Sequence, residues 1–368
     1  MRIAVLRETE PRERRVALVP QTVARLVQQG HAITIERGAG AAAALDDEQY
    51  RSAGAVVVAS AADGLRDADL VLKVQPPTAE QVGLIRRDGV LICLMQPHQQ
   101  AALLAALASA GVTALALELV PRTTKAQSMD VLSSQATVAG YRAVLAGTMH
   151  LGRFLPMLTT AAGTITPGKV CVMGAGVAGR QACARPRRRG AVGGAFDARP
   201  AVKEQVESLG ARFVEAGASA EGSGGYAREL SDDQQARVLA AIGGHVPDID
   251  LIVTTAAIPG KRAPVLLTTA MLATMRPGSV VVDVAAETGG NCEATVAGEE
   301  RVVHGVTVLG PLNLASGLPY HASFMLSKNF QSLLEHAVAE GQFRLSLDDP
   351  ILGPMCVTHA GAVRFGVA

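Results

Sequence analysis

Three glycines near the middle of the sequence have the spacing that lets a polypeptide backbone wrap around a phosphate. They lie in Gly174-Ala175-Gly176-Val177-Ala178-Gly179, between an apolar run that predicts a strand and a segment that predicts a helix. In this pattern the first glycine allows a tight turn, the second lets backbone N–H groups approach a pyrophosphate, and the third lets the helix pack close to the strand. The positive end of the helix dipole then faces the phosphates. The sequence therefore predicts that this segment binds a dinucleotide.

An acidic residue ends the next predicted strand, where it can reach the ribose of such a dinucleotide. Asp197 follows the first glycine by about 20 residues, as the motif requires. Its carboxylate can accept a hydrogen bond from a free 2′-hydroxyl and would repel a 2′-phosphate, so Asp197 favours NAD(H) over NADP(H). Arg199 follows closely and could instead accommodate a 2′-phosphate. We predict that both residues contribute to the cofactor site and that the cofactor is NAD(H).

The catalytic side chains of a hydrolase or an ordinary dehydrogenase do not stand out. The sequence has no G-x-S-x-G motif, no histidine pair with metal-ligand spacing and no paired-carboxylate motif, and we expect no metal site. Oxidation of an alcohol or an amine needs a group that takes the substrate proton. Hydride transfer between two nicotinamide rings needs none, because the protein has only to position the rings and exclude water. The scattered histidines are interpreted as structural; they include His98, His150, His304 and His321.

The alternation of strands and helices predicts how these residues are positioned. Short apolar runs such as 3–6, 32–36, 170–173 and 251–254 alternate with helix-length segments, which is typical of parallel sheets covered on both faces. We expect an α/β fold with two Rossmann-like, doubly wound parallel-sheet domains and an active-site cleft between them. The first domain is predicted to combine residues 1–135 with 320–368, and the second to span residues 136–319. The polar stretch 121–135, followed by a helix over 136–154, is either a hinge or a solvated loop.

Composition argues against several classes of protein. The 368 residues include 34 Lys and Arg against 33 Asp and Glu, and this net charge of +1 argues against nucleic-acid binding. Aromatic residues make up 3% and Trp is absent, so base stacking is disfavoured and the core must be aliphatic. The longest uncharged stretch, 89–117, is interrupted by polar residues and predicts no membrane span.

Cysteine usage and the first residues of the chain predict its compartment. The cysteines are Cys93, Cys171, Cys183, Cys292 and Cys356. They are odd in number and form no C-x-x-C pair, which indicates buried thiols in a reducing compartment, not disulfides or a zinc site. The first residues carry charge where a signal peptide needs its apolar region. We therefore expect a cytoplasmic protein.

The polar stretch 121–135 also carries the most specific pattern in the chain. The run Pro121-Arg122-Thr123-Thr124-Lys125-Ala126-Gln127-Ser128-Met129-Asp130-Val131-Leu132-Ser133-Ser134-Gln135 resembles the signature loop of the NAD(H)-binding component (domain I, alpha subunit) of proton-translocating NAD(P) transhydrogenase. The related alanine dehydrogenases share the fold but lack the Ser-Met-Asp-x-Leu-Ser-Ser run. The segments 174–179, 203–210, 258–261, 277–280 and 289–292 match the same family, so the resemblance covers nearly the whole chain.

The resemblance implies which residues surround the nicotinamide. Arg122, Gln127, Asp130 and Ser133 would form the catalytic site, and Gln127 and Ser133 would also bind the cofactor through its carboxamide. Arg122 and Asp130 would pair and orient the ring, or reach the nucleotide of a partner. The family also has a mobile loop whose Tyr closes over NAD(H), and Tyr226 in the glycine-rich segment 217–232 matches it.

The resemblance also implies partners and a location. In the family this component is a homodimer that meets an NADP(H)-binding beta subunit, whose conformation is coupled to proton movement through membrane-spanning subunits. It implies hydride transfer between NADH on this chain and NADP⁺ on the partner, with NADP(H) bound only by the partner. The protein would then be cytoplasmic and peripheral to the inner membrane through its partner subunits.

Two local features depart from the family pattern. Pro186, within Arg185-Pro186-Arg187-Arg188-Arg189, should kink or end the helix that follows the glycines. Gly193 and Gly194 weaken the next strand, where β-branched residues are expected. The arginines form either a solvated helix end or an anion-binding patch.

Two other functions remain open from the sequence. Arg15 and Lys73 resemble the pyruvate-binding arginine and the catalytic lysine of alanine dehydrogenase, which makes an NAD-dependent amino-acid dehydrogenase the first alternative. However, His98 is displaced from the position of that family's catalytic histidine. The second alternative is a non-catalytic NAD-binding regulatory module, and the retained residues of the signature loop argue against it.

Overall fold

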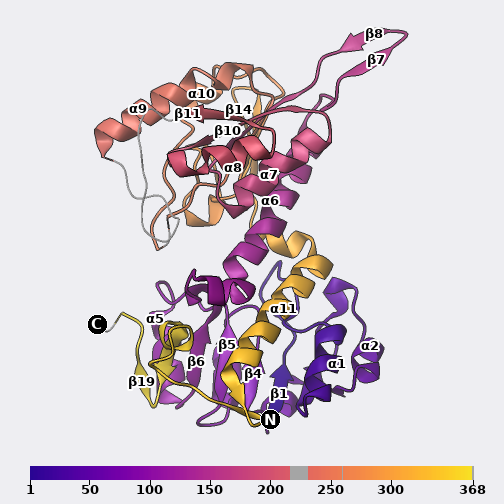
Figure 1. The fold of residues 1–368 in the computed structure, drawn as a ribbon, viewed down its shortest axis with the longest axis vertical. Coiled ribbons are helices and arrows are strands. Elements are labelled where there is room, and N and C mark those ends of the chain that lie inside the picture. The colour runs from indigo at the N-terminus through magenta and orange to yellow at the C-terminus, as the bar shows by residue number, and fades with distance from the viewer. Residues whose placement is uncertain (216–230, 259, 367–368) are drawn as a thin grey trace. The chain divides into compact units, whose positions relative to one another are not determined.

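The computed structural model describes residues 1–215, 231–258 and 260–366 of the chain. It divides into two compact units, Met1–Gln135 with Ala315–Ala368 (unit 1) and Ala136–Leu314 (unit 2). Figure 1 shows the elements of both units. Among the described residues, no helix combines the length and the apolar character that crossing a membrane would require.

In the described residues, unit 1 is built on an eight-stranded sheet. Its strand order is β19-β18-β6-β5-β4-β1-β2-β3, in which β18 and β19 are antiparallel to their neighbours and the other strands are parallel. The strands are β1 (Arg2–Val5), β2 (Ala32–Glu36), β3 (Val56–Val58), β4 (Leu70–Leu72), β5 (Val90–Cys93), β6 (Thr113–Ala116), β18 (Cys356–His359) and β19 (Ala362–Val363). The chain thus returns to unit 1 after unit 2 and extends its sheet beyond β6.

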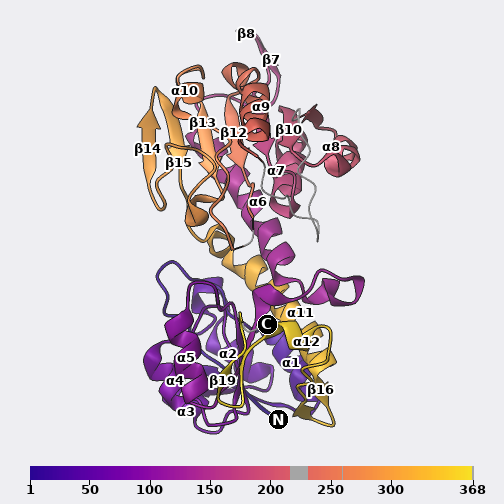
Figure 2. The same cartoon turned by 90° about the vertical axis from the view of Figure 1, so that its left-hand side faces the viewer.

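Both faces of this sheet are covered by helices, because successive side chains of a strand point to opposite faces. Ile3 and Val5 lie in one apolar core, and Ala4 and Leu6 lie in the other. The first core includes residues of α1 (Pro20–Gln28), α2 (Asp47–Ser52), α11 (Pro319–Ala337) and α12 (Leu352–Met355). The second includes residues of α3 (Ala61–Leu65), α4 (Ala79–Leu84) and α5 (Ala101–Ser109). Figure 2 shows α3, α4 and α5 together on one side of the sheet.

Helix α11 holds the segment that precedes α1. Leu326, Phe330 and Leu333 recur at helical spacing and are fully buried. On the same helix the hydroxyl groups of Ser323 and Ser327 accept hydrogen bonds from the backbone N–H groups of residues 16 and 19, each at 3.0 Å. Backbone donors that no strand or helix satisfies are thereby paired inside the core. A short hairpin of β16 (Val338–Ala339) and β17 (Gln342–Phe343) follows α11.

Unit 2 contains a seven-stranded sheet among the residues that the structure describes. Its order is β11-β10-β9-β12-β13-β15-β14, and only β14 within it is antiparallel. The strands are β9 (Lys169–Met173), β10 (Val192–Asp197), β11 (Arg212–Glu215), β12 (Leu251–Thr254), β13 (Val280–Asp283), β14 (Glu300–Val303) and β15 (Val306–Leu309). Val170 and Val172 face one core, and Cys171 and Met173 face the other.

Helices again cover both faces of the unit 2 sheet. Residues of α6 (Val131–His150), α7 (Val177–Arg188) and α8 (Lys203–Ser208) lie in the core of Val170 and Val172. Residues of α9 (Asp232–Gly243) and α10 (Thr269–Leu272) lie in the opposite core. The strands β7 (Leu158–Thr160) and β8 (Gly163–Ile165) form a separate hairpin that projects away from this sheet (Figure 1).

Each sheet has a point where the order of its strands reverses. In unit 2 the chain runs from β9 to β10 and β11 on one side and then returns to β12 on the other side of β9. In unit 1 it runs from β1 to β2 and β3 and then returns to β4. Ligands of doubly wound sheets bind beyond the carboxyl ends of the strands at such points. These ends are followed by Gly174 in unit 2 and by the segment that contains Glu8 in unit 1.

The structure corrects the expected boundary between the polar stretch and the long helix. Residues Thr124–Met129 form a 3₁₀ helix, and α6 begins at Val131, not at residue 136, and ends at His150. The last part of the predicted loop is therefore the first turn of a helix. Asp130 supports this turn because its carboxylate accepts hydrogen bonds from the backbone N–H and the hydroxyl group of Ser133 at 2.9 and 2.6 Å.

The two departures from the family pattern have little effect on the elements that contain them. α7 continues through Pro186 and ends two residues later at Arg188, so the proline lies in the last turn of the helix, where its side chain is buried. β10 includes Gly193 and Gly194 and pairs with β9 and β11 on both sides. The segment 216–230, which contains Tyr226 and most of the predicted loop 217–232, lies outside the described residues.

Candidate nucleotide-binding site

The glycine segment forms the turn between β9 and α7, and its first glycine makes this turn possible. Gly174 has φ +99°, a conformation that other residues rarely adopt, and a Cβ atom there would lie 2.8 Å from the backbone nitrogen of Ala256. Its N–H donates to the carbonyl of Phe196 at 2.8 Å, and its carbonyl accepts from the Thr255 hydroxyl at 2.8 Å. The turn is thus tied to both strands that flank β9.

The other two glycines have different surroundings. Gly176 is the N-cap of α7, and a Cβ atom added to it would meet nothing within 4 Å. A Cβ atom at Gly179 would lie 1.7 Å from the carbonyl oxygen of Gly174. Gly140 of α6 plays a similar packing role that the sequence did not indicate, because a Cβ atom there would lie 2.1 Å from the carbonyl oxygen of Ala178. Gly179 therefore lets the helix pack close to the strand, and Gly176 leaves open space at the helix N-terminus, which is the end suited to an anion.

Asp197 lies beside this turn and is almost completely buried. Its Oδ2 accepts the backbone N–H of Ala175 at 2.7 Å. Arg199 donates to the same carboxylate through its backbone N–H, Nε and Nη2, at 2.8, 2.8 and 2.7 Å. The hydrogen bonds from Arg199 to Asp197 raise the pKa of the guanidinium. The structure thus brings the glycine segment, Asp197 and Arg199 together at the carboxyl ends of β9 and β10.

A second buried carboxylate supports the neighbouring loop. Asp283, at the end of β13, is fully buried and accepts hydrogen bonds from the hydroxyl groups of Thr254 and Thr295 and from the backbone N–H groups of Ala285, Asn291 and Cys292. Asn291 in turn accepts the N–H of Ala256 at 3.0 Å and donates to its carbonyl at 2.9 Å. Since Ala256 follows Thr255, the chain of contacts from Asp283 through Asn291 reaches the residue that holds Gly174. Sequence reasoning singled out neither role, although Asn291 lies in a segment that matches the family.

Replacing Asn291 with alanine should loosen this loop and weaken NADH binding. The change removes the partners of both backbone groups of Ala256 and should cost about 1–3 kcal/mol of unfolding free energy. Urea unfolding and titration of NADH fluorescence measure the two effects. Gln235→Ala is the matched control, because Gln235 donates to the carbonyl of Val265 in the same loop without contacting Ala256. Equal NADH affinities for the two variants would contradict a role of Asn291 in placing the turn.

The predicted nicotinamide-site residues belong to unit 1. Arg122 and Gln127 are exposed, whereas Asp130 and Ser133 are hydrogen-bonded to each other at the start of α6. Met129 is buried in the core of unit 1 and anchors the loop between them.

The same loop is also fastened to α11. Asn329 donates to the carbonyl of Ser128 at 2.8 Å and accepts from the Ser134 hydroxyl at 2.6 Å. The structure therefore brings Asp130 and Ser133 together, and it places Arg122 and Gln127 on the exposed surface of the same fixed segment.

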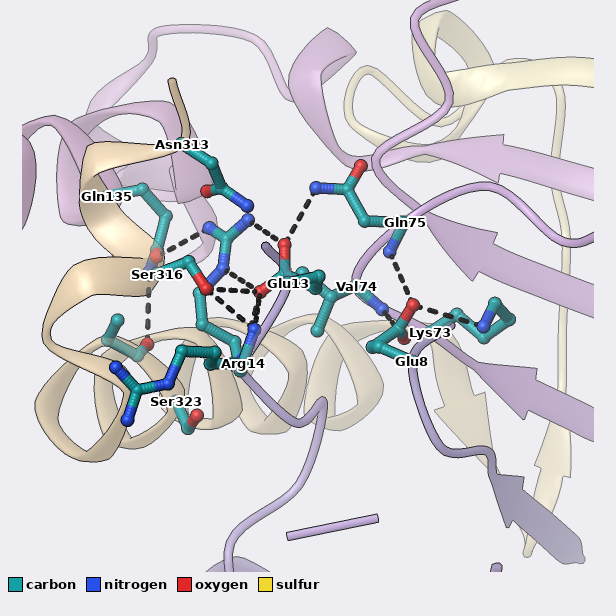
Figure 3. Close-up of polar contacts among 12 residues, drawn as sticks. Glu8, Glu13, Arg14, Lys73, Val74, Gln75, Gln135, Asn313, Ser316 and Ser323 are labelled. Atoms are coloured by element: carbon teal, nitrogen blue, oxygen red, sulfur yellow. Dashed lines mark hydrogen bonds and ion pairs between the residues drawn. The ribbon is translucent and has the colours of Figure 1, made fainter. Parts of the chain in front are cut away.

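Unit 1 also contains a cluster of buried charges, which lies beyond the carboxyl ends of β1 and β4 (Figure 3). Lys73 pairs with Glu8 at 3.1 Å, and both side chains are at most 3% exposed. Arg15 binds Glu13 through Nε at 2.8 Å and Nη2 at 2.6 Å. Arg15 also donates to Gln135, and Glu13 accepts further hydrogen bonds from Gln75 and Ser316. Sequence reasoning named Arg15 and Lys73 but missed the two glutamates, although Glu8 follows the first predicted strand directly.

The two glutamates of this cluster titrate in opposite directions. Burial would raise the pKa of Glu13, but the hydrogen bonds and charge of Arg15 lower it to about 2. Burial raises the pKa of Glu8, which Lys73 and the N–H of Val74 offset only partly. His98, the candidate catalytic histidine of the dehydrogenase alternative, is exposed and packs edge-on against Phe365 with ring centroids 4.7 Å apart.

Comparison with protein families covers both units. Residues 4–139 match the model of the alanine dehydrogenase/PNT N-terminal domain, and residues 143–366 match that of the C-terminal domain. The chain belongs to the alanine dehydrogenase/PNT family. It is 43% identical over 374 aligned positions to the first of the separately encoded parts of the NAD(P) transhydrogenase alpha subunit of Rhodospirillum rubrum, which covers 99% of this chain and 97% of the relative. Alanine dehydrogenase of Mycobacterium tuberculosis is 29% identical over 370 positions, covering 99% and 94%.

Within the alanine dehydrogenase/PNT family, the comparison of structures leads in the same direction. The crystal structure of transhydrogenase from Sinorhizobium meliloti matches with a TM-score of 0.90 and 43% identity, covering 99% of this chain and all of that one. The match confirms the predicted α/β fold with two Rossmann-like sheets. The identities also confirm the resemblance to the transhydrogenase alpha subunit, with alanine dehydrogenase as a more distant relative.

Proposed function

We propose that this chain is the NAD(H)-binding component of a proton-translocating transhydrogenase with separately encoded subunits. Hydride passes directly between NADH on this chain and NADP⁺ on an NADP(H)-binding beta subunit, and membrane-spanning subunits couple the transfer to proton translocation. The observation that carries the proposal is the signature loop, which is fixed on α11 by Asn329 and exposes Arg122 and Gln127. The transhydrogenase relatives that match the chain over nearly its full length support it.

The residues at the carboxyl end of β9 fit a dinucleotide. The segment Gly174–Gly179 opens at Gly176, where the backbone can approach a pyrophosphate at the N-terminus of α7. Asp197 is placed to bind the ribose hydroxyl groups, with Arg199 beside it. Tyr226, which lies outside the described residues, is proposed as the residue that closes over the nucleotide. When bound, the nicotinamide supplies the hydride at its C4 atom.

The residues of the signature loop bind and orient the nicotinamide. Gln127 is exposed and can hydrogen-bond the carboxamide, and the Ser133 hydroxyl can accept a further hydrogen bond while it donates to Asp130. Asp130 keeps this turn in place as the cap of α6. Arg122 adds a positive charge on the same segment. None of these residues has to take a proton, because hydride transfer between two nicotinamides moves no proton at the reacting atoms.

The proposed assembly follows the family. We propose a homodimer that associates with the beta subunit and, through its partners, with the inner membrane from the cytoplasmic side. In unit 2, Phe154, Met157 and Ile165 are exposed apolar side chains on or next to the β7–β8 hairpin. Exposed apolar side chains at a projecting hairpin support the proposal of a subunit contact there.

The test combines the chain with a partner component. The purified chain should bind NADH in a fluorescence titration and should transfer hydride to NADP⁺ or an analogue only when an NADP(H)-binding beta component is added. Gln127→Ala and Asp130→Asn should slow this transfer more than they weaken NADH binding, because both residues act on the placement of the ring. Normal transfer by both variants would remove these residues from the site.

Alanine dehydrogenase activity is the second candidate, and one observation favours it. Lys73 and Arg15 lie in one cluster at the carboxyl ends of β1 and β4, where a small substrate of a doubly wound domain would bind. Both cations are already paired with buried carboxylates, and His98 lies against Phe365. We therefore expect no deamination of L-alanine with NAD⁺. Deamination at an ordinary dehydrogenase rate would overturn the proposed function.

A further inference from the structure

The contact between Asp197 and Arg199 has a consequence for cofactor choice. An ionised carboxylate offers about four acceptor positions. In Asp197 these positions receive the N–H of Ala175 and the backbone N–H, Nε and Nη2 of Arg199. The side chain of Asp197 is 5% exposed and that of Arg199 is 15% exposed. A ribose hydroxyl group that binds Asp197 must therefore replace one of these donors.

The donors differ in how readily they can leave. The N–H groups of Ala175 and Arg199 are backbone groups fixed by the turn and by the end of β10, so they keep the carboxylate in place. The Nε and Nη2 groups belong to a side chain that is partly exposed and can rotate toward solvent. The guanidinium of Arg199 is thus the donor that a 2′-hydroxyl displaces.

The same guanidinium changes the effect of a 2′-phosphate. Paired with Arg199, Asp197 carries no net charge together with its partner, so its repulsion of a phosphate is offset. A displaced guanidinium remains beside the ribose position and can bind a phosphate through two parallel hydrogen bonds. A carboxylate without this arginine would instead exclude the phosphate strongly.

We propose that Arg199 is the specificity-determining residue of this site, and that it weakens the preference for NADH over NADPH which Asp197 alone would impose. The proposal rests on the proposed function, because it concerns the same dinucleotide site. The guanidinium competes with the ribose hydroxyl groups of either dinucleotide and compensates only NADPH for the exchange. Arg199 therefore binds the cofactor only when the cofactor carries a 2′-phosphate.

The experiment measures the dissociation constants of NADH and NADPH for the full chain by the fluorescence of the reduced nicotinamide. The chain has no Trp, so little protein fluorescence interferes. In Arg199→Ala the ratio of the NADPH constant to the NADH constant should rise about tenfold or more, with the NADH constant changed by less than about threefold. Arg199→Lys keeps the charge without the planar fork and should give an intermediate ratio.

The control is Arg187→Ala, which removes the same charge from the other end of α7, where Arg187 donates to the carbonyl of Gly210. Its ratio should equal that of the unchanged chain. Circular dichroism establishes that each variant is folded, and Arg199→Lys preserves the test if Arg199→Ala is not. An unchanged ratio in both Arg199 variants, or an equal loss of affinity for both dinucleotides, would overturn the role of Arg199. Failure of the unchanged chain to bind NADH would overturn the proposed function and this proposal with it.

Discussion

Gly179→Ala should destabilise unit 2 by about 3 kcal/mol, at the upper end of the range for overpacked sites, and should weaken NADH binding more than tenfold. The added Cβ atom would lie 1.7 Å from the carbonyl oxygen of Gly174. This oxygen belongs to the backbone and is held by the Thr255 hydroxyl, so it cannot rotate away as a side chain would. The start of α7 must then move away from β9, which opens the phosphate-binding turn. Urea unfolding followed by circular dichroism, and NADH titration, measure the two losses.

Gly176→Ala is the matched control for this prediction. Gly176 has φ −65°, which alanine adopts readily, and its Cβ atom would meet no atom within 4 Å. The stability should therefore change by less than about 0.5 kcal/mol. NADH binding should still fall, because the methyl group would occupy the space through which the backbone approaches the pyrophosphate. If the two variants unfolded at the same urea concentration, the packing role of Gly179 would be wrong.

Glu13→Ala should cost about 3–5 kcal/mol of the free energy of unfolding, because it leaves the charge of Arg15 buried without its carboxylate. The side chains of the pair are 4% and 0% exposed. Gln75 and Ser316 lose an acceptor in the same change. The double variant Glu13→Leu with Arg15→Met should recover much of the loss, since it removes both charges. A double variant that is as unstable as Glu13→Ala would contradict this account of the pair.

The same pair makes the stability of the chain depend on pH. The folded-state pKa of Glu13, at about 2, is below the ordinary value of 4.5. The stabilisation is therefore fully present above pH 4.5 and is lost as the pH falls from 4.5 through 2. It amounts to about 3 kcal/mol, taking about 1.36 kcal/mol for each pH unit. Urea unfolding at a series of pH values should show this loss in the unchanged chain and a smaller loss in Glu13→Gln.

The parts of the fold that the sequence predicts are those with a strong local pattern. β9, the glycine turn and β12 follow from apolar runs bounded by turn residues. β18 and β19 were not predicted, because they are short and their burial depends on pairing with β6, which is far away in the sequence. The β7–β8 hairpin was missed for a different reason: its residues are mostly exposed and carry no apolar period.

The candidate site divides in the same way. The spacing of the glycines and Asp197 is local, so the sequence predicts their proximity. The occupation of Asp197 by Arg199 depends on side-chain rotamers, and the sequence left both roles of Arg199 open. The burial of Glu8 and Glu13 depends on β4, α11 and the segment around Gln75, which only the folded unit brings together. The polar residues around Asp130 suggested a loop, because serine and aspartate favour both loops and helix caps.

The return of the chain to unit 1 has a consequence during synthesis. Residues 356–363 leave the ribosome only after the whole of unit 2, and until then β6 has no partner for the edge that β18 later covers. Residues 136–314 can meanwhile form their own sheet, since none of its strands comes from elsewhere. The nascent protein therefore completes the domain that begins second before the domain that begins first. For that interval, the apolar edge strand β6 is exposed to other strands and to chaperones.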